Sequence, residues 1–479
     1  MQPLPNGLVV FGKRDCATCE MMEPVFQQLA SGDTPLTVYS QDDPTFPGGV
    51  ENLIDDTSLE KSFHQNIETV PTLLRVVEGK EVDRIVGWNK NQWREFTGLD
   101  SLGEALPDHR PGCGAKNVEP GIAEELALRF GDDRLKSRRI ILSQLEDPIE
   151  TAYDRGWSDG LPIVPPTEAR VLKMLGGTQR DPGEVVGVIP PDLAECTVEK
   201  VAINAVMAGC KPEYLPVVLA AVEASCIEAF CMHGLLATTW FSSPVVIVNG
   251  PIAKKIGMNS GGNALGQGNR ANATIGRALQ LVIRNVGGGR PGGIDRATLG
   301  NPGKYTFCFA EDEEGSPWEP LSVERGIEEG ASAVTLFAGD GVQGVFDQLS
   351  RTPESLTKSF AACLRTVAHP KMAMTSDAFL VICPEHMRVY REAGWSKQKV
   401  KEEIGKHLMT PGSELIRGAG DIAEGLPEHF KDATIPKFRP GGLNLVHAGG
   451  KAGLFSAIIA GWLATGDMGS SPVTQEITE

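Results

Sequence analysis

The sequence has no basic run, no apolar run long enough to cross a membrane and no dense set of cysteines. With a formal net charge of −17 over 479 residues, the chain is expected to bind neither nucleic acid nor an anionic membrane surface. The closest candidate for a membrane span, residues 454–464, is shorter than the ~20 residues that a bilayer requires. The first residues show no basic segment followed by an apolar one, so we expect no secretory signal. Ten cysteines in a chain this long do not make a disulfide scaffold, which favours a reducing, cytoplasmic compartment.

The length and composition predict a globular protein of more than one domain. A chain of 479 residues exceeds one ordinary core, and 41% hydrophobic with 22% charged residues is usual for a globular protein. Residues 100–120 are polar, rich in proline and glycine, and lack periodicity, which is typical of a connector. We therefore predict a small domain at 1–104, a linker at 105–134 and a large domain at 135–479.

Two cysteines, Cys16 and Cys19, stand in a bend between an expected strand and an expected helix. An apolar run at residues 8–11 precedes the bend, and the apolar residues after it recur at helical spacing. This order places Cys16 at a helix N-terminus, where unpaired N–H groups and the helix dipole favour a thiolate. A thiolate with a second thiol in reach predicts a dithiol redox centre.

The elements around this pair resemble the thioredoxin superfamily. Pro24 stands five residues after the second cysteine, where thioredoxins have a helix-kinking proline, and Pro71 stands where they have a cis-proline loop. The resemblance implies that Cys16 is the exposed nucleophile, that Cys19 is the more buried resolving thiol, and that the two form a redox-active disulfide. It also implies that the loop at Pro71 is cis and lies beside the dithiol.

Other interpretations of these cysteines stay open at this point. The pair could bind zinc, although no two further ligands follow at a suitable spacing, or the domain could serve only as an interaction module. Cys113, between two glycines of the expected linker, could carry electrons between domains as a third thiol. The alternative is an incidental cysteine in a tight turn.

From residue 135 onward, expected strands and helices alternate with short connections. This alternation predicts an α/β domain with a mixed or mostly parallel sheet. The expected strands include residues 185–189, 244–249, 333–337, 379–383 and 443–447, and the expected helices include 271–286, 353–367 and 454–464.

Cys231 and His233 stand two residues apart after an expected helix. In extended backbone their side chains would share a face, and a nearby imidazolium lowers the pKa of a thiol. We therefore expect a catalytic thiol at Cys231 with His233 as its base. Together with Cys226 they could instead bind a soft metal, or the cysteines could simply pack in the core.

Two glycine-rich loops are expected to bind a substrate. Residues 259–270 contain four glycines and three asparagines directly before an expected helix, and residues 448–453 follow an expected strand, where ligands collect in α/β sheets. Neither loop matches a nucleotide-binding pattern, and we expect no metal and no cofactor beyond the Cys16–Cys19 disulfide. The residues expected to contact the substrate are Asn263, Gly266, Gly268, Asn269, Arg270, His447 and Lys451.

The large domain resembles, over nearly its whole length, a bacterial family without a settled reaction. Some members of that family are encoded beside small selenocysteine- or cysteine-dependent proteins similar to the glycine reductase system, which implies reductive chemistry. The stretches that carry the resemblance are residues 160–167, 203–214, 263–279, 297–311 and 316–326.

These observations predict a thiol-dependent oxidoreductase. The Cys16/Cys19 domain would supply reducing equivalents to an α/β catalytic domain that acts on a small, anionic substrate. The expected partners are this substrate and an external disulfide reductase or dithiol donor, and homo-oligomerisation is left open. Two alternatives are a lyase or hydrolase that carries the small domain as a docking module, and a protein that binds or transfers a soft metal through its thiols.

Overall fold

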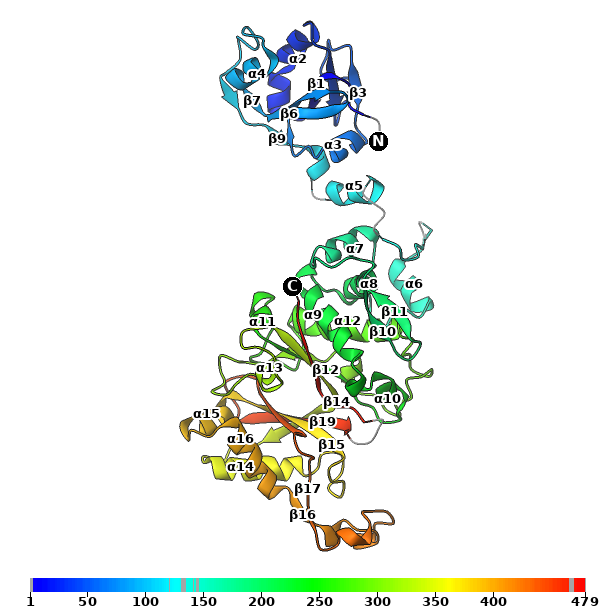
Figure 1. Ribbon diagram of the computed structural model, residues 1–479, viewed down its shortest axis with the longest axis vertical. Helices are drawn as coiled ribbons and strands as arrows, with labels where there is room; N and C mark the ends of the chain where they lie inside the picture. The colour runs from blue at the N-terminus through cyan, green and yellow to red at the C-terminus, as the bar shows by residue number, and fades with distance from the viewer. Residues whose placement is uncertain are drawn as a thin grey trace. The chain divides into compact units, whose positions relative to one another are not determined.

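The computed structural model describes residues 3–119, 121–130, 135–140, 142–143, 146–464 and 469–478. It divides into two compact units, Met1–Asp133 and Arg134–Glu479 (Figure 1). Most of the segment predicted as a linker therefore lies with the first unit. The two units are described separately.

The first unit is a five-stranded sheet with helices, in the strand order β3-β2-β1-β5-β6. β1, β2 and β3 run parallel, and β5 and β6 are added in antiparallel pairing. Every residue of β1 after Gly7 is buried, because a central strand covered on both faces is apolar throughout. The strands are β1 (Gly7–Gly12), β2 (Leu36–Ser40), β3 (Leu53–Asp55), β5 (Thr72–Val77) and β6 (Lys80–Val86).

The helix after the cysteine bend is divided into two parts. α1 (Ala17–Met21) ends at Met22, and α2 (Glu23–Ala30) begins there with Pro24 in its first turn. Proline has no N–H to donate, so it is tolerated only where the preceding turn needs none. The break therefore follows from Pro24. Two further helices complete this part of the unit, α3 (Glu60–His64) and α4 (Lys90–Thr97).

The second unit contains a seven-stranded mixed sheet in the order β13-β12-β14-β19-β15-β18, with β20 also paired to β14. The β12–β13 and β15–β18 pairs are parallel and the remaining pairs are antiparallel. The predicted α/β class with a mixed sheet is confirmed. The strands are β12 (Ser243–Asn249), β13 (Cys308–Ala310), β14 (Ala333–Phe346), β15 (Ser376–Ile382), β18 (Leu443–His447), β19 (Phe455–Leu463) and β20 (Val473–Glu476).

Two groups of helices cover this sheet, and Figure 1 shows them toward opposite ends of the unit. Val246 and Val248 of β12 pack against α8 (Val198–Ala208), α9 (Leu215–Ser225) and α12 (Arg270–Asn285). Leu380 and Ile382 of β15 pack against a second group. Alternate residues of the same strands point into a third cluster on the other face, as the two-residue period of a strand requires. The second group consists of α14 (Pro353–Leu364), α15 (Pro384–Glu392) and α16 (Lys397–His407).

One predicted helix of the large unit is wrong. Residues 454–464 were expected to be helical, but β19 occupies 455–463 at the centre of the sheet, between β14 and β15. A central strand is buried on both faces and loses the alternation that marks a strand, so a short apolar run is ambiguous. Ile458 and Ile459, which are fully buried here, have the branched side chains that favour a strand.

Among the described residues, no single helix has both the length and the apolar character to cross a membrane, although one bent pair, Pro212–Ser225 with Glu228–Ala237, meets those two criteria together.

Candidate functional site

The thiol of Cys16 lies at the N-terminus of α1, where the bend before it is fixed by one carboxylate. Asp42 accepts hydrogen bonds from the backbone N–H of Arg14 at 2.7 Å and of Asp15 at 2.9 Å. Cys16 is the N-cap residue, and its Sγ accepts the backbone N–H of Cys19 at 3.3 Å. This geometry directs the unpaired donors of a helix start at one sulfur.

The environment of the pair separates the acidities of its two thiols. The Cys19 thiol hydrogen-bonds to Cys16 and, with weaker help from Cys113 and the backbone of Cys19 and Thr18, lowers the pKa of Cys16 to about 5 against the opposing effect of burial. Burial raises the pKa of Cys19 far above its usual value. Cys16 is therefore a thiolate at neutral pH, while Cys19 retains its proton as the hydrogen-bond donor.

The predicted cis-proline loop lies beside this thiolate. The Val70–Pro71 peptide is cis, as the resemblance implied, and the carbonyl oxygen of Val70 is 3.6 Å from Cys16 Sγ. Val70 belongs to the short strand β4 (Thr69–Val70).

Residues 109–118, which we call the strap, cover the dithiol. β8 (His109–Arg110) of the strap pairs with β7 (Trp88–Asn89), and β9 (Cys113–Gly114) pairs antiparallel with β4. Three further hydrogen bonds hold the strap: Thr18 Oγ1 to Pro111 O at 2.7 Å, Ala115 N to Glu68 O at 3.0 Å and Asn117 Nδ2 to Ile67 O at 2.8 Å. The strap is therefore an ordered part of the first unit.

The strap brings a third thiol to the site. Cys113 is directly opposite Val70 in the β4–β9 pair, and it is near enough to Cys16 to lower the pKa of Cys16 while its own pKa is raised, mainly by burial. Gly112 permits this close approach, because a Cβ there would lie 2.8 Å from the carbonyl oxygen of Val70. Cys113 was expected on a mobile connector, and the structure instead fixes it in a strand.

One implied property of Cys16 is corrected by the strap. The resemblance implied an exposed nucleophile, but Cys16 is only 3% exposed. The strap lies beside the dithiol, because β9 pairs with β4 and Thr18 donates a hydrogen bond to Pro111 O. Cys16, Cys19 and Cys113 carry free thiols in this structure.

The premise for pairing Cys231 with His233 is wrong. The two were expected in extended backbone, but Cys231 is the N-cap of α10 (Met232–Ala237), has a left-handed φ of 53°, and is followed by helix. Side chains two residues apart on a helix do not face each other. His233 is exposed and Cys231 is half-buried.

The side chains of the first predicted substrate loop are held by the protein itself. Asn263 donates to Gln267 O at 2.6 Å, Asn269 caps α12 by accepting the N–H of Asn272, and Arg270 donates to Gly209 O at 2.9 Å. Gly268, with a φ of 114°, takes a conformation that favours glycine. Gly266 lies so close to Asn263 that a Cβ there would be 2.1 Å from the amide oxygen.

The second predicted substrate loop contacts the first one. Gly449 donates its N–H to Ser260 O at 2.8 Å, so the structure brings the two glycine loops together as expected. Lys451 is exposed in this loop. His447 is 1% exposed, with Nδ1 2.8 Å from Ile382 O and Nε2 3.5 Å from an Asp312 oxygen; burial lowers its pKa.

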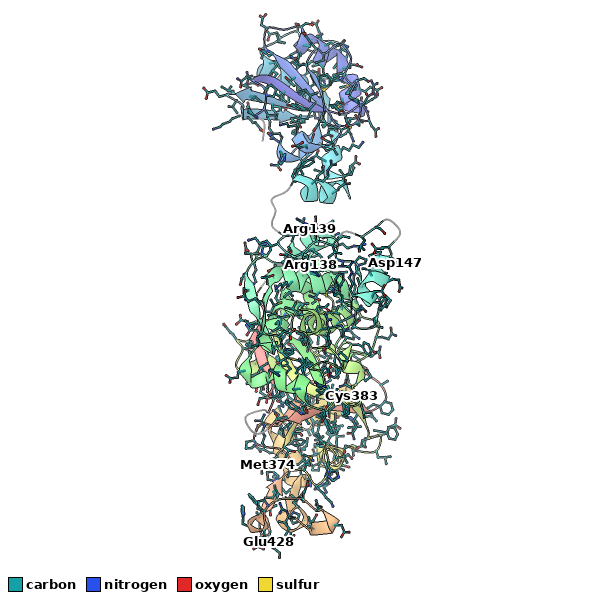
Figure 2. The ribbon with its side chains drawn as sticks, turned by 90° about the vertical axis from the view of Figure 1, so that its right-hand side faces the viewer. Arg138, Arg139, Asp147, Met374, Cys383 and Glu428 are labelled. Atoms are coloured by element: carbon teal, nitrogen blue, oxygen red, sulfur yellow. The ribbon has the colours of Figure 1, made fainter. Side chains whose placement is uncertain are left out.

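A cysteine that the sequence analysis did not single out lies under these loops. Cys383 is the N-cap of α15 at the carboxyl end of β15 (Figure 2). Burial alone would raise its pKa, but the neighbouring imidazole and the backbone N–H of His386 bring the pKa below its ordinary value. A thiol at a helix start with an imidazole in contact is the pattern expected of a reactive cysteine.

Two hydrogen-bond partners fix the orientation of the His386 ring. Its Nε2 lies 2.9 Å from the carbonyl oxygen of Asp347 and therefore carries a proton, and its Nδ1 lies 2.7 Å from Ser456 Oγ. Ser456 in turn accepts the N–H of Cys383 at 3.1 Å. The sequence signal was the order strand, cysteine, proline-started helix, with the histidine one turn into the helix.

Within the described part of the chain, no group of three or more His, Cys, Asp and Glu side chains is arranged to hold a metal ion. No family model matches the sequence. A protein of Dictyostelium discoideum named as a thioredoxin-4 is 30% identical over 95 residues, which are 20% of this chain and 78% of that protein. The resemblance of the large unit to a bacterial family stays a prediction.

Proposed function

Through its first unit the chain belongs to the thioredoxin family, and we propose that it is a thiol–disulfide oxidoreductase with a centre of three thiols. The observation that carries this proposal is the position of Cys16, whose sulfur accepts the backbone N–H of Cys19 at the start of α1 and lies beside Val70, the residue opposite Cys113. Cys16 is the nucleophile, Cys19 is the resolving thiol and Cys113 is a second thiol in reach.

The proposed reaction transfers two electrons to a disulfide. The Cys16 thiolate attacks one sulfur of the substrate disulfide, a Cys16 mixed disulfide forms and one thiolate leaves. Cys19, after giving up its proton, attacks Cys16 Sγ and releases the second thiolate. The substrate disulfide is reduced, the Cys16–Cys19 disulfide is formed, and an external dithiol donor reduces it again.

Cys113 offers a second route out of the mixed disulfide. Its thiol can attack Cys16 Sγ to give a Cys16–Cys113 disulfide, which Cys19 then exchanges for Cys16–Cys19 with release of Cys113. The strap also occupies the edge of β4, so an incoming extended chain can pair there only after the strap has left. Cys113 is therefore proposed as a relay thiol, and the strap that carries it is proposed to block the edge of β4 beside the dithiol.

The finer part of the proposal is that these electrons serve the large unit. Two sites on one chain meet at an effective concentration of mM order when a flexible linker allows it. A target thiol in the large unit must be reactive. Cys383 satisfies this requirement through its helix N-terminus and His386. We therefore propose Cys383 as the target thiol in preference to Cys231, because the pairing of Cys231 with His233 depended on extended backbone.

A trapping experiment tests the relay. In the full chain carrying Cys19→Ser, glutathione disulfide should oxidise Cys16, and Cys113 should resolve the adduct, so that non-reducing peptide mass spectrometry finds a Cys16–Cys113 disulfide. Absence of this disulfide, with glutathione retained on Cys16, would remove Cys113 from the proposal.

A second variant separates the two targets. With Cys19→Ser and Cys113→Ala together, neither neighbouring thiol can resolve Cys16. Glutathione disulfide should first convert Cys383 to its glutathione adduct, and the Cys16 thiolate should then attack Cys383 Sγ, release glutathione as the leaving thiolate and be captured as a Cys16–Cys383 disulfide. Capture at Cys231 would make Cys231, and not Cys383, the target thiol of Cys16 in the large unit. Glutathione as the sole adduct on Cys16 would contradict electron transfer to the large unit while leaving the dithiol chemistry intact.

A further inference from the structure

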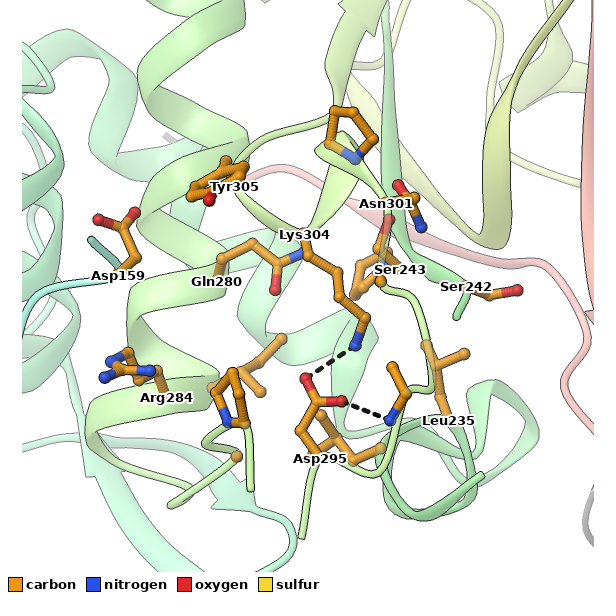
Figure 3. A pocket seen from close by; sticks show the side chains of 18 of the residues that line it. Asp159, Leu235, Ser242, Ser243, Gln280, Arg284, Asp295, Asn301, Lys304 and Tyr305 are labelled. Atoms are coloured by element: carbon orange, nitrogen blue, oxygen red, sulfur yellow. Dashed lines mark hydrogen bonds and ion pairs between the residues drawn. The ribbon is translucent and has the colours of Figure 1, made fainter. Parts of the chain in front are cut away.

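A pocket of about 530 Å³ lies in the large unit beside α10, the helix that Cys231 caps. α12 forms one wall, α10 another, and residues 289–305 close it (Figure 3). Met232, Leu235, Leu236 and Ile283 give it an apolar side. A cavity of this volume with an apolar side and a few polar groups is typical of a site for a small molecule.

The carboxylates of the pocket are already neutralised. Asp159 accepts two hydrogen bonds from Arg277, both at 2.8 Å. Asp295 accepts a hydrogen bond from the ammonium of Lys304 at 2.8 Å and another from the backbone N–H of Ala297 at 3.2 Å. Figure 3 shows the Lys304–Asp295 pair beside Gln280 of α12, with Arg284 of the same helix below Asp159. Each acidic group therefore has its own cation.

Arg284 is a cation without such a partner. Its Nε is buried and has no hydrogen-bond acceptor, and among the described residues it forms no ion pair. Its one hydrogen bond goes to Gly156 O at the long distance of 3.3 Å. Burial, and then nearby Arg290, lower the pKa of Arg284, while the Asp159 carboxylate, which is already paired with Arg277, opposes them more weakly.

A second polar atom in the pocket also lacks a partner. Ser243 Oγ, at the start of β12, is buried without a hydrogen bond. Buried polar groups are almost always satisfied in folded proteins, and each exception calls for an explanation such as a ligand. Both atoms belong to residues that line the cavity, but neither atom is itself accessible, so a ligand would meet Arg284 through another atom of its guanidinium.

We propose that this pocket binds a small organic monocarboxylate, with its carboxylate on the guanidinium of Arg284 and its apolar part against α10. A carboxylate matches the planar fork of donors that a guanidinium presents. The single uncompensated charge favours a monoanion, since a phosphate dianion would need a second free cation inside the pocket. This site is independent of the dithiol centre.

The test uses the full chain and a set of simple probes. Acetate, butyrate, hexanoate and phenylacetate are each compared with the alcohol of the same carbon skeleton by saturation-transfer difference NMR. The larger carboxylates should bind with Kd on the order of 1–10 mM, and each alcohol should bind at least about tenfold more weakly. Inorganic phosphate should not displace them at equal concentration.

Three variants make the test specific. Arg284→Gln should weaken the binding of hexanoate at least about tenfold, Arg284→Lys should weaken it less, and Arg388→Gln, an exposed arginine on α15, should leave it unchanged. Circular dichroism checks that each variant is folded. The proposal is overturned if no carboxylate binds, if acids and alcohols bind equally, if phosphate displaces them, or if folded Arg284→Lys and Arg284→Gln bind like the unchanged chain.

Discussion

Replacing Cys16 with serine is expected to lower the rate at which the full chain reduces a disulfide substrate, with excess dithiol as the electron donor, by at least about 10³-fold. Loss of a nucleophile usually costs at least this much, and a serine hydroxyl is not ionised at neutral pH. Among the described residues of the first unit no equivalent sulfur remains, because Cys19 is fully buried and Cys113 lacks the hydrogen bonds of the helix start.

A matched substitution serves as the control for this result. Cys363→Ser changes a half-buried cysteine on α14 of the other unit and should leave the rate within about twofold, as surface changes usually do. Cys19→Ser should stop multiple turnover but still permit one attack by Cys16. If Cys16→Ser and Cys363→Ser reduced the substrate equally fast, the dithiol centre would have no part in the reaction.

The large unit should lose about 3–5 kcal/mol of unfolding free energy in Arg439→Met. Asp377, at the start of β15, is 1% exposed and accepts two hydrogen bonds from Arg439, at 2.8 and 2.6 Å. Removal of one partner leaves a buried charge without compensation, which costs this amount in measured cases. Urea titration followed by circular dichroism measures the change.

Two further variants decide whether the unpaired charge is the cause. Arg439→Met combined with Asp377→Asn removes both charges and should be more stable than Arg439→Met alone, because the two effects are coupled. Arg388→Met breaks an exposed pair 4.0 Å long with Glu392 and should change stability by less than about 0.5 kcal/mol. If the double variant is no more stable than Arg439→Met, the loss of unfolding free energy comes from lost packing and not from the unpaired charge.

The first unit could be predicted well because its signals are local. The strand of residues 8–11, the cysteine pair at a helix start and the prolines at 24 and 71 each act through backbone geometry that neighbours in sequence determine. The strap could not be predicted, since β8 and β9 have two residues each and their partners lie far away in sequence. A two-residue strand has no measurable periodicity.

The site in the large unit was predicted less well, for a similar reason. Glycine and asparagine in residues 259–270 indicated a ligand loop, but the same residues also cap α12 and close turns, and the structure gives Asn269 and Arg270 these local tasks. The order of strand, cysteine and proline-started helix is visible around Cys383, but the contacts that orient His386 come from Ser456 and Asp347, which lie far away in the chain. Likewise, the missing partner of Arg284 is a property of the fold alone.

The most direct test of the account is the ionisation of Cys16, followed by the absorbance of the thiolate at ~240 nm from about pH 4 to pH 9 in the reduced full chain, with the Cys16→Ser chain subtracted. Because the pKa is lowered from 9.0 to about 5, the thiolate signal should be complete at neutral pH and disappear as the pH falls through about 5. Cys113→Ala should move the transition upward, and Cys113→Ser, which keeps a donor, should move it less. A transition near pH 9 that is unaffected by Cys113 would contradict the three-thiol centre.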